Sequence, residues 1–144
     1  MKLWMLHPVA VHFPIALLTV GCGALVISIS WDRWPWLSEG VSWLLWVGTG
    51  AAWAALGLGL LAEKTAPHVP EAWQVLADHK AAAWWTVGWF TFVSFWRVSQ
   101  GRRREWILLI GWLLGIAMLI RTGYHGGQVV FTHGMGVAGH GMGH

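Results

Sequence analysis

The chain of 144 residues is poor in charge, cysteine and tyrosine. Charged residues make up 10% of it and hydrophobic residues 56%, which is far from the composition of a soluble domain and predicts a membrane protein. The single cysteine, Cys22, excludes an intrachain disulfide, and without a C-x-x-C-H motif any haem is held noncovalently. The nine basic residues are spread between apolar segments and form no basic stripe, so nucleic acid is not an expected partner.

Motifs of the common enzyme classes are absent too. The sequence has no P-loop, no G-x-S-x-G, no dinucleotide fingerprint and no H-E-x-x-H, and no nucleophile stands beside a base. We therefore expect a non-catalytic subunit rather than an enzyme of these classes.

Four apolar segments are long enough, at about 1.5 Å per residue, to cross a hydrocarbon core of about 30 Å. The first is too long for a secretory signal. The second is rich in glycine, which favours close helix packing, and many of the fourteen tryptophans are expected at helix ends. We predict an all-α integral membrane four-helix bundle over residues 1–133 and a flexible Gly/His/Met tail over 134–144. The predicted spans are 8–30, 41–62, 79–98 and 106–122, with a short surface helix over 71–78 and a loosening of the last helix at Gly123, Gly126 and Gly127.

Histidines mark the ends of the apolar segments. Four crossings put both termini and the loop between the second and third spans on one membrane face, so this parity gathers the histidines there. The cluster Arg102, Arg103 and Arg104, with Arg33 and Arg97, favours a cytoplasmic location for the opposite face, against Lys2, Lys64, Lys80 and Arg121 on the histidine face. We expect a multi-pass protein of the bacterial inner membrane with both termini periplasmic or extracellular. The histidines are His7, His12, His68, His79, His125, His133, His140 and His144.

The opening His7-Pro8-Val-Ala-Val-His12-Phe13-Pro14 is the most specific local motif. Pro8 suits the first helical turn, whereas Pro14 distorts the backbone hydrogen-bond ladder. His12 then lies about one turn below the surface, where an imidazole needs a partner. A helix cap explains His7 equally well, and a bond to a backbone carbonyl is the alternative for His12.

Imidazoles from different helices can bind a haem iron from opposite faces, and neutral imidazole also binds copper and zinc. His125 and His133 are eight residues apart, about 12 Å along an ideal helix, so they do not share one ordinary metal unless the helix breaks. Gly48, Gly50 and Gly57 offer either room for a haem face or simple close packing. In the tail, His133-Gly-Met-Gly is echoed by His140-Gly-Met-Gly-His144, a soft ligand set suited to copper or an ordinary unstructured tract.

The opening motif, the histidine of the third span and the closing Gly126-Gly-Gln-Val-Val-Phe-Thr-His133-Gly-Met-Gly-Val137 together resemble a bacterial family of four-helix membrane proteins of unknown function. Its members open with HP-x-x-x-HFP-x-AL and close with GG-x-LVY-x-HG-x-GV. Similar domains occur fused to c-type cytochrome or Rieske-like domains, so the resemblance implies a redox association. It also implies that His7, His12, His79 and His133 are the functional histidines, whereas His68, His125, His140 and His144 have no counterpart.

These observations predict a cytochrome b-like electron-transfer subunit that binds haem b noncovalently near the outer face. We expect His12, His79 and His133 as axial ligands, with His7 ranked after them because a cap explains it. Expected partners are other membrane or periplasmic redox subunits, a quinone or a c-type cytochrome. Two alternatives stay open, a membrane protein that binds copper or another transition metal, and a structural membrane subunit without a cofactor.

Overall fold

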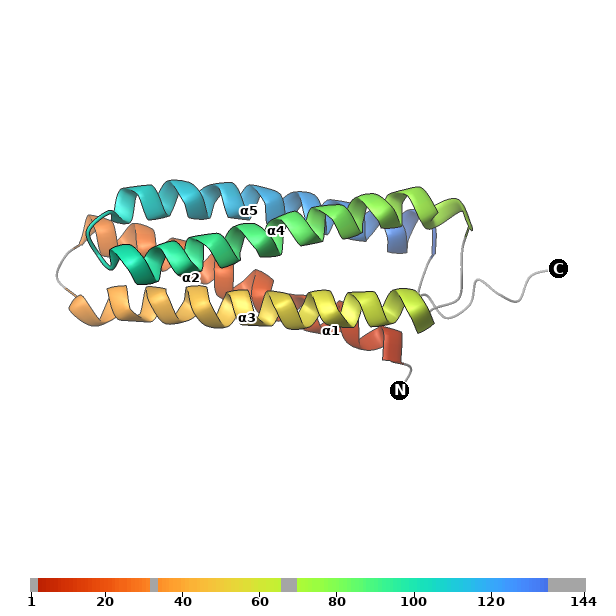
Figure 1. The fold of residues 1–144 in the computed structure, drawn as a ribbon, viewed down its shortest axis with the longest axis horizontal. Coiled ribbons are helices and arrows are strands. Elements are labelled where there is room, and N and C mark those ends of the chain that lie inside the picture. Colours follow the sequence, from red (N-terminus) through yellow and green to blue (C-terminus); the bar gives the residue numbers. More distant parts are fainter. Residues whose placement is uncertain (1–2, 32–33, 66–69, 135–144) are drawn as a thin grey trace.

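The computed structural model describes residues 3–31, 34–65 and 70–134, and within these ranges every regular element is a helix (Figure 1). The prediction of an all-α membrane bundle is therefore confirmed. Of the predicted 134–144 tail, only Gly134 lies within the described residues. The elements are the short 3-10 helices η1 (Leu3–Met5) and η2 (Pro70–Ala72), the α-helices α1 (Leu6–Ala10), α2 (His12–Ser30), α3 (Pro35–Thr65), α4 (Trp73–Gln100) and α5 (Glu105–Gly127), and the π-helical turn η3 (Gln128–Thr132).

The first span contains α1 and α2, which are separated only at Val11. Pro14 has no N–H to donate one turn back, so the break falls where the sequence predicts a distorted ladder. The second span begins at Pro35, earlier than predicted, since proline fits the first turn of a helix.

The predicted surface helix over 71–78 is wrong. Its residues belong to η2 and to the first turns of α4, which starts at Trp73 rather than at His79. Ala72 is buried against Val129 of η3, with Val75 and Leu76 packed beside them, so burial extends the helix outward. The prediction that the last helix loosens at Gly123 and Gly126 is also wrong. The α-helix α5 continues through Gly127, and the chain widens into the π-helical turn η3 only after it.

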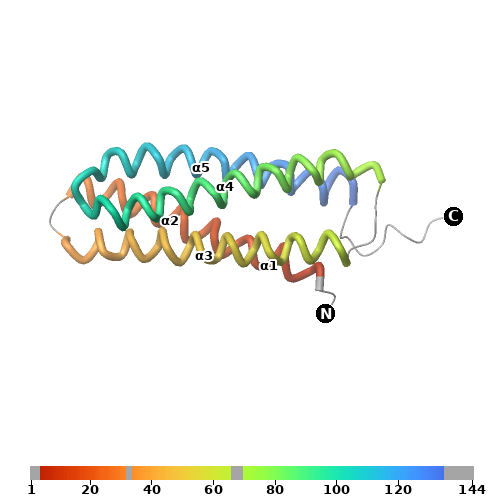
Figure 2. Tube along the Cα trace, in the orientation of Figure 1, coloured from red at the N-terminus to blue at the C-terminus, as the bar shows by residue number. Residues whose placement is uncertain are grey.

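The four long helices run alternately up and down (Figure 2), with α2 packed on α3 and α5, and α4 packed on α3 and α5. Three spans, Leu6–Ser30, Pro35–Thr65 and Glu105–Thr132, are long and apolar enough to cross a membrane. The less apolar α4 is not among them, but it has a similar length and runs antiparallel to α3 and α5. One end of the bundle holds the beginning of the first helical segment, the last described helix, the end of α3 and the start of α4 (Figure 1). This is the arrangement that the parity of the segments predicts.

The bundle consists of two helical hairpins that repeat the same close contact. A β-carbon on Gly48 of α3 would lie 2.8 Å from Leu18 Cδ2 of α2, and one on Gly115 of α5 would lie 2.6 Å from Phe90 Cζ of α4. Leu18 and Phe90 are 72 positions apart in the chain, and the two glycines are 67 apart. In lipid, helices associate through such close van der Waals packing, so each hairpin depends on its glycine. We call the segment from α1 to α3 the first hairpin and the segment from α4 to α5 the second.

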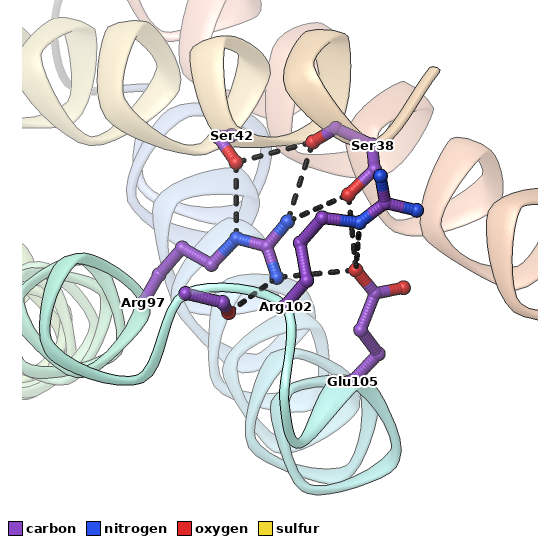
Figure 3. Close-up of polar contacts among 6 residues, drawn as sticks. Ser38, Ser42, Arg97, Arg102 and Glu105 are labelled. Carbon is purple, nitrogen blue, oxygen red and sulfur yellow. Dashed lines mark hydrogen bonds and ion pairs between the residues drawn. The ribbon is translucent and has the colours of Figure 1, made fainter. Parts of the chain in front are cut away.

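The end of the bundle opposite the histidines carries a buried polar cluster (Figure 3), which the sequence did not reveal. Arg97 of α4 is 3% exposed, and its Nε donates to Ser42 Oγ at 2.9 Å, while its terminal nitrogens donate to Ser38 Oγ at 3.0 Å and to Glu105 Oε1 at 3.3 Å. The carbonyl of Gly101, which takes a positive φ of 57° after α4, accepts another bond at 2.9 Å. The cluster therefore ties α3, α4, the α4–α5 turn and α5 together.

Charged residues at these positions are not repeated in the first hairpin. Leu25, which is fully buried, stands 72 positions before Arg97, and Ser38 stands 67 before Glu105. Burying a charge costs several kcal/mol unless partners surround it, and all five guanidinium hydrogens of Arg97 have acceptors here.

We predict that Arg97→Leu lowers the free energy of unfolding in detergent by about 3 kcal/mol, because Ser38, Ser42 and the partly buried Glu105 then lose their shared partner, and Glu105 keeps only its longer contact with the exposed Arg102 at 3.7 Å. The double variant Arg97→Leu with Glu105→Ser copies the first hairpin and is expected to lose less than the sum of the single changes. Arg102→Ala, at a side chain that is 51% exposed, is the control and should change stability by less than about 1 kcal/mol. Additivity of the two single changes within about 0.5 kcal/mol would contradict the coupling.

Candidate metal centre

His7 of α1 lies against the second half of α3. Its Nδ1 is 2.9 Å from the carbonyl oxygen of Ala55, and its ring covers Gly59, where a β-carbon would lie 3.0 Å from His7 Cε1. The accepting residue and the glycine are four apart, so they occupy one face of α3. The imidazole is half-buried and held from two sides by backbone.

His79 of α4 has the same environment against α5. Its Nδ1 is 3.0 Å from the carbonyl oxygen of Thr122, and a β-carbon on Gly126 would lie 3.0 Å from His79 Cε1. Thr122 and Gly126 are again four apart. The helix register is kept through Gly126, so the glycine that the sequence suggested would loosen α5 instead makes room for an imidazole.

The two histidines are equivalent in the repeat of the hairpins. His7 and His79 are 72 positions apart, like Leu18 and Phe90, and their supporting glycines are 67 apart. The ring centroids of the two imidazoles are 6.3 Å apart, with 70° between the ring planes. Each hairpin therefore contributes one imidazole to the same point between the hairpins.

The hydrogen bonds fix the chemistry of the pair. A carbonyl oxygen only accepts, so Nδ1 of each ring is the donor, and Nε2 of each neutral ring keeps its lone pair. A hydrogen bond from the far ring nitrogen to a backbone carbonyl is the support that metal-bound histidines commonly have. Each ring of the pair therefore keeps one nitrogen with a free lone pair.

His12 and His133 make local contacts. The exposed His12 has its Nδ1 2.7 Å from the carbonyl oxygen of Pro8, and His133 has its Nδ1 3.1 Å from that of Gln128. The ring centroids of His125, in the last turns of α5, and Tyr124 are 5.8 Å apart, and His125 is also close enough to His79 to interact with it electrostatically. His68, His140 and His144 lie outside the described residues, as does the proposed copper motif beyond Gly134.

The structure thus pairs His79 with His7, which the sequence ranked after His12 and His133. Nothing in the sequence locates Ala55 and Gly59 opposite His7, although the equal 11-residue spacing from Gly48 to Gly59 and from Gly115 to Gly126 was a readable signal of a repeat. Over residues 3–31, 34–65 and 70–134 there is no group of three or more His, Cys, Asp or Glu side chains arranged to hold a metal ion. In this part of the chain, the site is a pair of imidazoles.

A family model described as predicted membrane protein (DUF2231) matches residues 4–139, nearly the whole chain. The chain belongs to the DUF2231 family. No curated protein and no solved structure matches it significantly. The DUF2231 description agrees with the membrane bundle described above and carries no activity or cofactor. The region that matches the DUF2231 model includes both histidines of the pair and both supporting glycines.

Substitution of the supporting glycines tests this geometry. Gly59→Ala and Gly126→Ala are expected to displace an imidazole and lower the thermal midpoint of the detergent-solubilised protein. Gly57→Ala and Gly123→Ala are matched controls in the same helices, because a β-carbon there meets nothing within 4 Å. The controls should be neutral or gain up to about 1 kcal/mol from the better helix propensity of alanine. A gain in all four variants would show that the rings do not rest on the glycines.

Proposed function

We propose that this chain is a membrane electron-transfer subunit in which His7 and His79 are the two axial ligands of one b-type haem iron. The observation that carries the proposal is the 6.3 Å separation of two imidazoles whose Nδ1 atoms are both bonded to backbone carbonyls. Two imidazoles on opposite sides of one metal ion, with metal–nitrogen bonds of about 2.0 Å, have centroids roughly 6 Å apart. The separation therefore suits a shared ion.

The number of ligands favours haem iron over a bare ion. A haem brings four equatorial nitrogens of its own and needs two axial ligands, whereas structural zinc takes four protein ligands. Two imidazoles from two hairpins of a helical bundle are a common haem-binding arrangement. When bound, the haem supplies reversible one-electron chemistry, and the chain holds the rings and excludes bulk water from their Nδ1 side.

The proposal extends to the setting of the chain. The arginine-rich end, which includes Arg97 and the exposed Arg102, Arg103 and Arg104, favours a cytoplasmic orientation, with the histidine pair toward the periplasm of a bacterial inner membrane. At that face the haem lies within reach of a periplasmic or membrane-bound redox partner, such as a c-type cytochrome or another subunit of a larger complex.

The test is a visible difference spectrum, dithionite-reduced minus oxidised, of the detergent-purified protein, with metal analysis of the same sample. We expect a sharp α-band and about one iron per chain, both lost in His7→Ala and in His79→Ala. His12→Ala and His133→Ala are the matched controls and should retain the band, since these rings bond within their own segments.

Other outcomes separate the alternatives. Bound copper without an α-band, lost when residues 135–144 are removed, would favour the copper-binding protein. A folded protein that binds no cofactor, and whose His7 and His79 variants change only in thermal stability, would favour the structural subunit. Loss of the α-band in His12→Ala or His133→Ala, with retention in His7→Ala, would contradict the ligand assignment.

A further inference from the structure

A groove of about 340 Å³ lies between α4 and α5 beside the support of His79. Its polar lining residues are Asp78, Thr86 and Arg121, and its apolar walls include Trp85 and Met118. Asp78 and Arg121 are exposed, and Thr86 is 2% exposed. A volume of this size falls within the range of small-molecule sites in proteins.

Comparison of the two hairpins shows that the fold does not require these polar residues. By the offsets of the repeat, the first hairpin has Leu6, Pro14 and Ala54 where the second has Asp78, Thr86 and Arg121. Apolar lining residues keep their character, with Phe13 in the place of Trp85. The surface between α4 and α5 therefore carries three polar side chains that the equivalent surface of the first hairpin lacks.

Thr86 connects the groove with the histidine pair. Its Oγ1 lies 2.8 Å from Thr122 Oγ1, and the carbonyl of the same Thr122 accepts the hydrogen bond from His79 Nδ1. Only Thr86 therefore separates a molecule bound in the groove from Thr122, whose carbonyl orients the proposed iron ligand His79. In the first hairpin the equivalent residues, Pro14 and Ala55, have no side-chain hydrogen-bonding groups for such a connection.

We infer that this groove binds the ring of a membrane quinol, an inference that rests on the proposed electron-transfer function for its choice of ligand. A quinol has an oxygen at each end of an aromatic ring and an apolar tail. Asp78 accepts a hydrogen bond from a hydroxyl, Arg121 donates to an oxygen, and the ring packs on Trp85 and Met118. The tail extends into lipid, since the groove lies on an outer surface where Trp85 is 73% exposed.

The experiment titrates decylubiquinol, kept reduced under anaerobic conditions, into the detergent-purified protein by isothermal calorimetry, which detects binding with or without haem. Arg121→Gln should weaken binding about tenfold, the effect of one lost hydrogen bond to a charged group. Ala81→Leu fills the groove and should abolish binding. Its matched control is Ala77→Leu, an exposed alanine one turn away on α4 that does not line the groove and should bind as the unchanged chain does.

The outcomes keep the two proposals apart. Protein with an α-band that binds no decylubiquinol, or whose Ala81→Leu and Ala77→Leu variants bind equally, overturns the quinol site and leaves the haem proposal intact. Protein without iron that binds decylubiquinol in the groove supports the site and overturns the haem proposal. Binding of phosphatidylethanolamine in the groove with no heat from decylubiquinol identifies a lipid-binding groove and overturns the quinol inference.

Discussion

Close approach of helices at glycine is the constraint on which the rest of this structure depends. Within lipid, apolar burial gives helices little reason to prefer one another, so contact at short range decides which surfaces meet. Gly48 admits Leu18, and Gly115 admits Phe90. Three helical turns further along the same faces, Gly59 and Gly126 admit imidazoles rather than apolar side chains. The packing contact and the histidine contact are therefore successive contacts of one interface.

The repeat of the two hairpins separates what the fold needs from what one hairpin has added. Equivalent positions carry the same residue where the hairpins share a contact, as at His7 and His79. They differ at the opposite end, where Arg97 replaces the apolar Leu25, and along the outer groove, where Thr86 replaces Pro14. A buried polar group in a membrane is costly unless it is partnered, and both of these side chains are partnered: Arg97 by Ser38, Ser42 and Glu105, and Thr86 by Ala82 and Thr122.

A pair of imidazoles oriented by backbone carbonyls suits a redox centre for a physical reason. The rings lose little freedom when a metal binds, because Ala55 and Thr122 already hold their Nδ1 atoms. Rigid ligands keep the coordination similar in both oxidation states, which favours fast electron exchange.

The sequence by itself determined the class of structure. Apolar length and scarce charge require helices that satisfy their own backbone in lipid, and the parity of four crossings is enough to bring the helix-end histidines to one face. Helix ends were less predictable, since the burial of Ala72 against Val129 extends α4 beyond its apolar stretch. Only the tertiary structure decided that His7 is opposite His79 and that Arg97 is enclosed by Ser38, Ser42 and Glu105. These pairings depend on the rotation of each helix about its axis, which close contacts between distant residues set and which no local pattern encodes.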